Sequence, residues 1–449
     1  MKTGALNSKE INVSMRIDGS FHLSDGVILE REILKHPHKP LVDFCSNIFT
    51  SGRSKRVYTK KEHGYPYLSN SDVVAQNPFD SCNYNSRKYG YDKSAFLKEG
   101  MILTGRVGAI GQTAYVTREF DEKEAMGSDN IIRIVANPSE YNGYIYSFLS
   151  SRVGNTLLWK LAAGGVQPYI TDQMVKNIPV PIFPESKQKE IHNLIVESTN
   201  MRVEANRLLD QAISELEKEL PTIIEHKYEK VSLSLMIENS LRMEATTNYI
   251  QIKRFYEKLN EKYEIKIVAD MSKEVFTPNI FKRQRTNDVS TGIPFLSGSD
   301  LTNFRPSFTS FLSKKMKNID NYILRDGWIA IQDAGTIGYV TLINGYLDGV
   351  TATNNLVRII PNKENENLYI FAFLKTKQGQ FILKSQQFGS VQKHIDNNAI
   401  ANFKIPILNS YESVKSKVLQ YNLKTTESCI KESQAISLVE KEIESWQQS

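Results

Sequence analysis

The run Gly64-Tyr65-Pro66-Tyr67-Leu68-Ser69-Asn70-Ser71-Asp72 occurs a second time in the chain, as Gly292-Ile293-Pro294-Phe295-Leu296-Ser297-Gly298-Ser299-Asp300. Further segments match in the same order on both sides of it. They are Arg16-Ile17-Asp18 with Arg242-Met243-Glu244, Gly108 to Gly111 with Gly335 to Gly338, Asn130 to Ile134 with Asn355 to Ile359, Tyr144 to Leu149 with Tyr369 to Leu374, Val166-Gln167 with Val391-Gln392, and Val180-Pro181-Ile182 with Ile405-Pro406-Ile407. The distance between partners stays between 225 residues (391 minus 166) and 228 residues (292 minus 64). One unit of roughly 225 residues is therefore duplicated, which predicts a tandem of two domains rather than a solenoid of short repeats.

The composition is that of a folded chain. Of the 449 residues, 40% are hydrophobic and 24% are charged, which excludes a disordered protein. No apolar run approaches the roughly 20 residues of a membrane span, and Met1 to Ile11 lacks the apolar core of a secretory signal. Cys45, Cys82 and Cys429 lie far apart without a CxxC pair, which argues against zinc and disulfides and favours the cytoplasm. The net charge of +6 permits a polyanionic partner without requiring one.

Each copy divides into a mixed part and a long helix. Short strand-like runs, for example Ile131 to Val135, alternate with Gly, Asn and Pro turn signals. One helical stretch is expected from Tyr144 to Leu161, with a counterpart from Tyr369 to Lys384, and prolines such as Pro184 and Pro406 precede each long helix. The predicted fold class is α+β, with mixed α/β domains at residues 1–184 and 226–409 and long helices at 185–225 and 410–449.

The two long helices carry apolar or small residues at alternating spacings of three and four, the pattern of a coiled-coil seam. These are Ile191, Leu194, Ser198, Met201, Ala205, Leu208 and Ala212 in the first helix, and Val414, Val418, Tyr421, Thr425, Cys429, Ile436, Val439, Ile443 and Trp446 in the second. We expect the helices to form an antiparallel coiled coil, with a pseudo-twofold axis relating the copies. The alternative is that each helix packs on its own domain or on another subunit.

A glycine-rich run, Gly105-Arg106-Val107-Gly108-Ala109-Ile110-Gly111, invites a phosphate-loop interpretation. Its spacing is not that of a dinucleotide or Walker motif, and no Walker lysine follows. In the second copy Gln332 replaces Gly105, and only the last two glycines persist. Glycines kept between two strands predict a tight turn.

Basic clusters recur at corresponding places and predict DNA contacts, because arginine and lysine neutralise phosphates while arginine, glutamine and asparagine also bind base edges. The candidates are Arg53, Lys55, Arg56 and Lys60 in the first copy, and Lys282, Arg283, Gln284 and Arg285 in the second. We compare Arg53-Ser54-Lys55-Arg56 with Lys282-Arg283-Gln284-Arg285. The bland alternative is a solvated charged loop in each copy.

A second group of candidates comes from shared loops. A Gly-rich loop in each copy ends in a glutamine followed by aromatic or cationic residues, and a glutamine either binds adenine or satisfies backbone in a turn. In the Ser-x-Ser-Asp loop, the repeated aspartate is expected to fix the turn and its variable neighbours to face DNA. Together with Arg106 beside the glycine turn, these candidates are Asn70, Gln167, Tyr169, Ser299, Gln392, Lys393 and His394.

The sequence contains no specific catalytic motif. The chain has no Asp-Pro-Pro-Tyr-type tetrapeptide, no G-x-S-x-G and no H-E-x-x-H, and its seven histidines are scattered. We therefore predict no catalytic site and no metal site.

In its order of motifs and its duplication, the chain resembles the DNA-specificity subunits of type I restriction–modification systems, in which two target recognition domains alternate with two long helices. The resemblance covers nearly the whole chain. It rests on the duplicated Gly-x-Pro-[Tyr/Phe]-Leu-Ser run, the Gly-x-Ile-Gly turn, the Asn-x-x-x-Arg strand and the Val-Gln loop. It also rests on the proline-rich run from Ile178 to Ile191, whereas its counterpart from Ile405 to Ser410 lacks the later proline and glutamine.

The resemblance implies a non-catalytic subunit for phage defence that binds double-stranded DNA and reads a bipartite target. It implies that the long helices set the gap between half-sites and dock two methyltransferase subunits. Those partners would bring S-adenosylmethionine, and ATP-dependent restriction subunits would be optional additions. Two alternatives stay open: a recognition subunit of a type IIB-like or other phage-defence methylation system, and a coiled-coil scaffold that binds no DNA.

Overall fold

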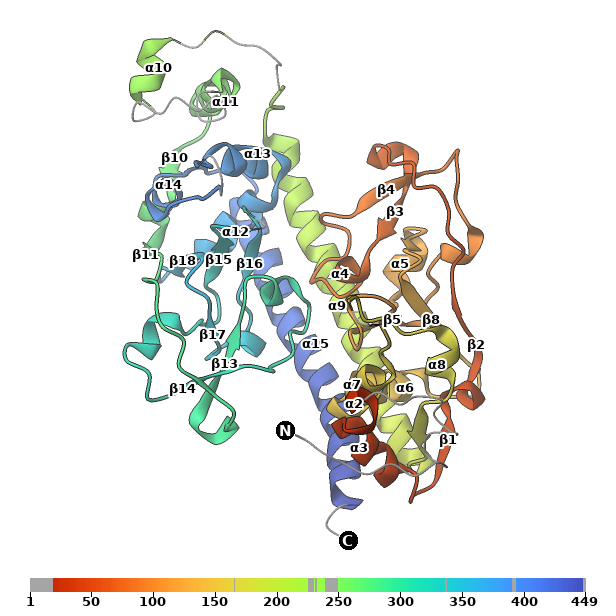
Figure 1. Cartoon of the computed structure of the whole chain (residues 1–449). Helices are drawn as coiled ribbons and strands as arrows, with labels where there is room; N and C mark the ends of the chain where they lie inside the picture. Colours follow the sequence, from red (N-terminus) through yellow and green to blue (C-terminus); the bar gives the residue numbers. More distant parts are fainter. Residues whose placement is uncertain are drawn as a thin grey trace. The chain divides into compact units, whose positions relative to one another are not determined.

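The structure is a computed structural model that describes residues 19–164, 166–224, 230, 232–238, 249–335, 337–389 and 393–446 (Figure 1). The match of Arg16-Ile17-Asp18 with Arg242-Met243-Glu244 lies outside these residues, as do Val391 and Gln392. The chain forms two compact units, which we call unit 1 (Met1–Val203 with Ser428–Ser449) and unit 2 (Glu204–Glu427).

Unit 1 contains three antiparallel or mixed sheets. The largest has the strand order β2-β8-β5-β6, the second has the order β4-β3-β7, and the third pairs β1 with β9. The strands are β1 (His38–Pro40), β2 (Cys45–Thr50), β3 (Gly64–Leu68), β4 (Asn83–Ser86), β5 (Ile102–Gly105), β6 (Thr113–Tyr115), β7 (Met126–Gly127), β8 (Ile131–Ala136) and β9 (Pro179–Pro181).

Unit 2 repeats this topology, with one additional edge strand in its second sheet. Its sheets have the orders β11-β18-β15-β16, β12-β14-β13-β17 and β10-β19. The strands are β10 (Ile265–Ile267), β11 (Ser272–Phe276), β12 (Arg285–Thr286), β13 (Gly292–Leu296), β14 (Phe311–Ser313), β15 (Ile329–Gln332), β16 (Val340–Leu342), β17 (Thr351–Ala352), β18 (Leu356–Pro361) and β19 (Lys404–Pro406). The duplication predicted from the sequence is confirmed at the level of sheet topology.

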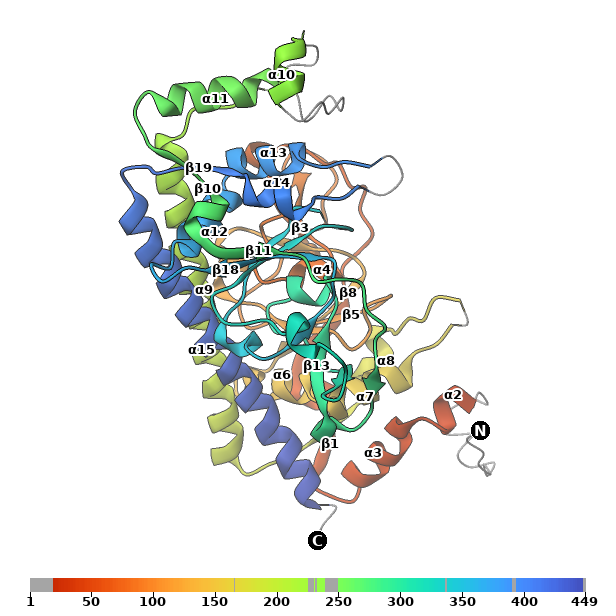
Figure 2. The ribbon, with the colours of Figure 1, turned by 90° about the vertical axis from the view of Figure 1, so that its left-hand side faces the viewer.

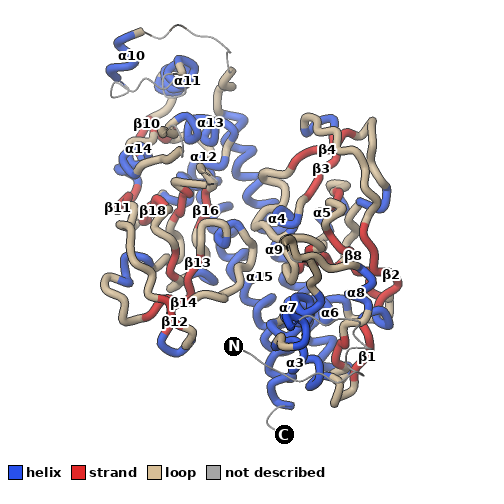
Figure 3. The backbone as a smooth tube through the Cα atoms, viewed as in Figure 1, coloured by secondary structure: helices blue, strands red, loops and turns tan. Residues whose placement is uncertain are grey.

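The helices follow the same duplication, except that unit 1 has short α-helices at Asn70–Val73 and Arg118–Glu122 where unit 2 has 3-10 helices at Asp300–Thr302 and Gly345–Leu347. In unit 1 they are α2 (Gly19–His22), α3 (Asp25–Ile33), α4 (Asn70–Val73), α5 (Arg118–Glu122), α6 (Asn142–Ser150), α7 (Arg152–Leu161) and α8 (Asp172–Lys176). In unit 2 they are α10 (Leu233–Glu238), α11 (Ile250–Asn260), α12 (Asn367–Lys375), α13 (Lys377–Ser385) and α14 (Asn397–Ala401). The long helices are α9 (Glu185–Glu219) and α15 (Tyr411–Trp446), and each contributes one part to each unit. In each unit the strands lie on one side of the parts of the long helices that belong to that unit (Figure 3).

The single helix expected from Tyr144 to Leu161 is two helices, and so is its counterpart. Ser151 ends α6 in an extended conformation and its hydroxyl accepts a hydrogen bond from the Gly154 N–H, while Thr376 does the same with Gly379. A side chain at Gly154 would meet the Phe148 carbonyl at 2.1 Å. A capping hydroxyl and a glycine three residues later therefore break the helix in both units.

The long helices pair antiparallel, as predicted (Figure 2). In unit 1 the Lys431 ammonium lies 2.8 Å from Glu197, and the Ser198 hydroxyl donates to the Ser428 carbonyl at 2.8 Å. In unit 2 Lys424 lies 2.9 Å from Glu204 and Lys417 lies 3.0 Å from Glu215. In every pair a later residue of α9 meets an earlier residue of α15, which is the signature of antiparallel helices.

The predicted seam of α15 is right and that of α9 is half right. Ile191, Ser198, Ala205 and Ala212 are buried, but the alternate positions are occupied by Ile195, Arg202 and Leu209 rather than by Leu194, Met201 and Leu208. Arg202 interrupts the apolar pattern, because a charged residue is ordinarily expected on the surface. In the structure it is buried, and its guanidinium donates a hydrogen bond to the Ala75 carbonyl at 2.5 Å. No helix among the described residues is long and apolar enough to cross a membrane.

Candidate nucleic-acid interface

The duplicated Ser-x-Ser-Asp run forms the same capped turn in each unit. The Asp72 carboxylate accepts hydrogen bonds from the backbone N–H of Ser69 at 2.8 Å and from its hydroxyl at 2.6 Å. The Asp300 carboxylate accepts the same two bonds from Ser297, at 2.7 and 2.6 Å. The repeated aspartate fixes the turn, as predicted. The residues between, Asn70 and Ser71 in unit 1, face the candidate site described below.

The glycine-rich run is a turn between antiparallel strands β5 and β6, as predicted. Gly108 and Gly111 have φ values of +75° and +80°, and Gly335 and Gly338 in unit 2 have +77° and +78°. These left-handed conformations favour glycine and explain why both copies keep it. The turn brings the backbone of Val107 to Asn70, whose side-chain amide donates to the Val107 carbonyl at 3.1 Å.

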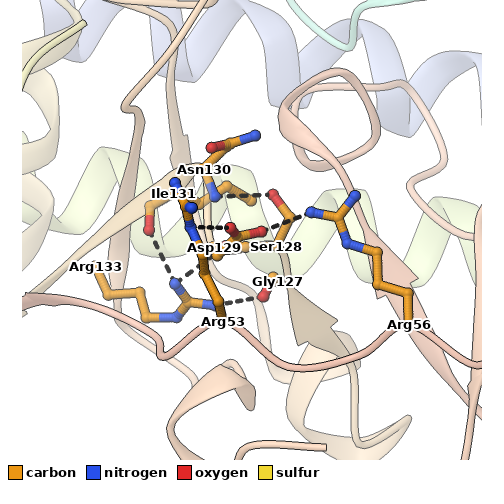
Figure 4. A network of polar contacts seen from close by, with 8 residues as sticks. All are labelled: Arg53, Arg56, Gly127, Ser128, Asp129, Asn130, Ile131 and Arg133. Carbon is orange, nitrogen blue, oxygen red and sulfur yellow. Dashed lines mark hydrogen bonds and ion pairs between the residues drawn. The ribbon is translucent and has the colours of Figure 1, made fainter. Parts of the chain in front are cut away.

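A fully buried arginine fixes the loop before strand β8. Arg133 donates to the Ile131 carbonyl at 2.9 Å and to the Gly127 carbonyl at 2.5 Å (Figure 4), and burial lowers the pKa of its guanidinium to about 10. Arg358 has the equivalent place in unit 2, where it donates to the carbonyls of Asn321 and Tyr322. The arginine of the shared Asn-x-x-x-Arg motif is thus a structural residue, and it fixes the loop that carries Ser128, Asp129 and Asn130.

Two of the predicted DNA-binding arginines converge on this loop. The Arg56 guanidinium Nη2 lies 2.7 Å from Asp129 Oδ1, and Arg53 Nε lies 3.6 Å from the other carboxylate oxygen. Figure 4 shows the two arginines approaching Asp129 from opposite sides. The Arg56 guanidinium also lies over the Tyr67 ring, 5.5 Å from its centroid. The hydrogen bond that Arg56 donates to Asp129 raises the pKa of the Arg56 guanidinium.

Beside Arg56 lies a cavity of about 490 Å³ with a polar wall. Its amides and hydroxyls come from strands β3 and β4, the capped turn and the loop around Asn130. The lining residues are Arg56, Tyr58, Tyr67, Ser69, Asn70, Ser71, Asp72, Ser81, Asn83, Val107, Ala109, Gln112, Ser128 and Asn130. The Asn70 carbonyl oxygen Oδ1 is buried and has no hydrogen-bond partner. Such a surface offers many donors and acceptors in neutral groups, the chemistry needed to bind base edges.

In unit 2 the contacts change the residue alignment that the sequence suggested. Arg283 lies over the Phe295 ring, 5.1 Å from its centroid, so Arg56 corresponds to Arg283 and not to Arg285. Arg285 pairs with Leu312 of β14, just as Tyr58 bridges to Asn85 in unit 1. Four-residue blocks of the same charge had concealed this shift of two positions.

The Gly-rich loops have the same stem in both units. The backbone groups of Ala163 and Tyr169 exchange two hydrogen bonds of 2.9 Å, and those of Phe388 and His394 exchange bonds of 2.9 and 2.8 Å. Gln167 and Lys393 are exposed on these loops, and Gln392 lies outside the described residues. Tyr169 also bridges to Val107, so this loop and the glycine turn lie side by side in unit 1.

The structure brings some predicted residues together and leaves others apart. Arg53, Arg56, Asn70 and the backbone beside Arg106 gather around the cavity of unit 1. Lys55, Lys60, Lys282, Gln284 and Ser299 are exposed on loops. Most of the other lining residues were not predicted from the sequence, among them the polar residues Asn83, Gln112 and Asn130, and neither was Asp129 beside Arg56. Asn130 belongs to the duplicated Asn-x-x-x-Arg motif, so that signal was available for it. Among the described residues no group of His, Cys, Asp and Glu could hold a metal ion.

One family model matches the chain, and several solved structures are similar to it. A model described as the type I restriction modification DNA specificity domain matches residues 42–215 and 257–421, about three quarters of the chain in two segments. A type I restriction–modification S subunit from M. genitalium is 14% identical, with a TM-score of 0.29, over 91% of this chain and 94% of that one. The HsdS subunit from Thermoanaerobacter tengcongensis is 13% identical, with a TM-score of 0.28, over 90% of this chain and 95% of that one. The type IIG restriction endonuclease BpuSI is 11% identical, with a TM-score of 0.30, over 41% of this chain and 29% of that one.

Proposed function

The chain belongs to the type I restriction–modification DNA specificity family, as a non-catalytic specificity subunit, and from this premise we propose that each unit reads one half of a bipartite DNA target. We take residues 1–184 and 226–409 as the two target recognition domains. The surface that would bind DNA is formed by the basic loop, the capped turn, the glycine turn and the Gly-rich loop of each unit.

The observation that carries this proposal is the recurrence of one arrangement at equivalent places. In each unit an arginine of the basic loop lies over an aromatic ring of the central strand, Arg56 over Tyr67 and Arg283 over Phe295. A stacked guanidinium keeps donors at its edge, and such donors bind guanine or phosphate. A random charged loop would not place the same cation on the same ring twice.

The differences between the units support two different half-sites. Arg106 of unit 1 is replaced by Asp333 in unit 2, a reversal of charge at a position whose backbone makes the same contacts in both units. An arginine favours guanine, whereas a carboxylate accepts a hydrogen bond from the cytosine amino group. Burial raises the pKa of the Asp333 carboxyl, and its Oδ1 has no hydrogen-bond partner. The residue at the end of the Gly-rich loop also differs between the units, since it is Tyr169 in unit 1 and His394 in unit 2.

For partners, we propose double-stranded DNA, two methyltransferase subunits docked on the long helices and optional ATP-dependent restriction subunits. Leu419 and Leu423 support this, because they lie one turn apart on α15 and are 45% and 59% exposed. In this proposal S-adenosylmethionine binds to the methyltransferase partner and not to this chain. The complex would act in the cytoplasm, because cysteines that are free, like Cys45, Cys82 and Cys429, are typical of its reducing environment.

The experiment that tests the proposal exchanges one recognition domain. Residues 10–184 are replaced by the corresponding domain of another family member, and the recognised motif is determined before and after. The proposal expects one half of the motif to change and the other half to stay. A change in both halves would refute independent recognition domains, and absence of any motif in the parent complex would refute sequence-specific reading.

A further inference from the structure

Asp129 and Tyr67 hold the Arg56 guanidinium from two directions, and unit 2 has only one of these two supports. We infer that Asp129 is a positioning residue that aims Arg56 at a guanine in the half-site of unit 1, and that Arg283 contacts the DNA backbone instead. This inference rests on the proposed function, since it specifies what one unit reads.

The geometry leaves Arg56 held but reachable. The Asp129 carboxylate accepts a hydrogen bond from Arg56 Nη2 at 2.7 Å. The Asp129 side chain is only 15% exposed, so its carboxylate is fixed. The Arg56 side chain is 44% exposed. A guanidinium has five N–H donors, so several remain after the bond to Asp129. Guanine presents O6 and N7 as a pair of acceptors in the major groove, and an arginine binds both at once.

The charge around Arg56 favours a base over a phosphate. A carboxylate beside the guanidinium repels phosphate oxygens and offsets the positive charge that would attract them. The wall next to Arg56 is formed by neutral amides, including Asn70, Asn83 and Gln112. Arg53 has a side chain that is 83% exposed and sits 3.6 Å from the same carboxylate, so it is better placed to meet the backbone.

Unit 2 provides an internal comparison. Arg283 lies 5.1 Å from the Phe295 ring centroid, but the residue that corresponds to Asp129 is Asn354. The side-chain amide Nδ2 of Asn354 donates a hydrogen bond to the side-chain oxygen Oδ1 of Asn355 at 2.7 Å. Within the described residues Arg283 has no carboxylate partner. Its full charge and its freedom to turn on the ring suit a phosphate contact.

The test selects binding sites from random duplexes with the full-length chain in complex with its methyltransferase subunits. The variants are Asp129→Asn, Arg56→Lys, their combination and Arg283→Lys. Asp121→Asn is the matched control, because it removes the carboxylate of another 2.7 Å ion pair, with Lys98, in the same unit. Exchange of residues 10–184 identifies the half-site of unit 1.

The wild-type complex is expected to prefer guanine at one position of that half-site by roughly fivefold or more, the discrimination of a bidentate contact. Asp129→Asn and Arg56→Lys should each abolish most of this preference and leave the other positions intact. Asp129→Asn should add nothing in the Arg56→Lys background. Arg283→Lys should weaken binding to all sequences alike, and Asp121→Asn should change nothing.

Two results would overturn the inference while leaving the proposed function intact. One is a split motif whose unit 1 half retains its guanine preference in Asp129→Asn. The other is a uniform loss of affinity on all sequences in that variant, measured in protein whose thermal unfolding matches the wild type. A wild-type complex without sequence preference would instead refute the proposed function itself.

Discussion

The Tyr144 phenol donates a hydrogen bond of 2.7 Å to the Pro181 carbonyl, and Tyr369 makes the same bond, at 2.7 Å, to Pro406. Both tyrosines are fully buried and lie 225 residues apart. Each bond joins the buried helix of a recognition domain to the strand that leads into a long helix. The duplicated sequence thus repeats the attachment of each domain to its helix.

Tyr144→Phe should lower the free energy of unfolding by about 1–2 kcal/mol, because the buried Pro181 carbonyl loses its donor while the ring still packs. Chemical denaturation followed by circular dichroism measures this. Tyr89→Phe is the control, since the Tyr89 side chain is 55% exposed and lies on a loop of the same unit. An equal loss in both variants would contradict the role given to the Tyr144 hydroxyl.

The duplication, the glycine turns and the capped turn could be predicted from the sequence, because each depends on local residue types that occur twice. The break between α6 and α7 was missed, since Ser151 and Gly154 within an apolar run do not by themselves show that one caps and the other permits close packing. Only half of the α9 seam could be predicted, because Arg202 is charged and is therefore expected on the surface, although it is buried in the structure.

The candidate site was harder to predict than the fold. Basic residues mark the surface, but the carboxylate that orders them, Asp129, follows 73 residues after Arg56 and has no charged counterpart in the second copy. A contact over such a distance depends on the antiparallel pairing of β2, which precedes Arg56, with β8, which follows Asp129, and residue types do not reveal this pairing.

Stability should fall with rising pH between about 10 and 12, and Tyr115→Phe should lessen the fall. Burial raises the pKa of Tyr115 from 10.0 to about 12, so the folded phenol keeps its proton where the unfolded one loses it. The contribution is intact below pH 10 and is lost as pH rises through 12, by roughly 2–3 kcal/mol. Unfolding free energies at pH 9 and 12 test this, and parallel curves for both proteins would contradict it.

Lengthening both long helices should lengthen the gap between half-sites. The antiparallel contacts place Arg207 of α9 near Tyr421 of α15, so a heptad inserted at both places keeps the seam on each side. Seven residues add about 10 Å, or roughly three base pairs. Motif determination should return the same two half-sites with a longer gap.

A heptad inserted at Arg207 alone is the control, because it moves every later residue of α9 past its partner on α15. This variant should lose stability and specific binding together. An unchanged gap in a stably folded double insertion would contradict the role of the helices as a spacer.

Leu423→Glu should prevent the methyltransferase subunits from binding without unfolding the chain, because the side chain is 59% exposed on α15. Copurification and size-exclusion chromatography measure the loss of the complex. Leu34→Glu is the matched control, since Leu34 is 50% exposed at the end of α3. A complex that forms equally well with Leu423→Glu would show that the partners dock elsewhere.

Methylome sequencing of cells that carry this chain with its methyltransferase subunits tests whether one chain reads two separate DNA half-sites. We expect a split, asymmetric motif that disappears when the chain is deleted, and whose unit 1 half loses specificity in Arg56→Ala while the unit 2 half stays. Methylation without a split motif, or a motif that is unchanged in cells without this chain, would contradict it.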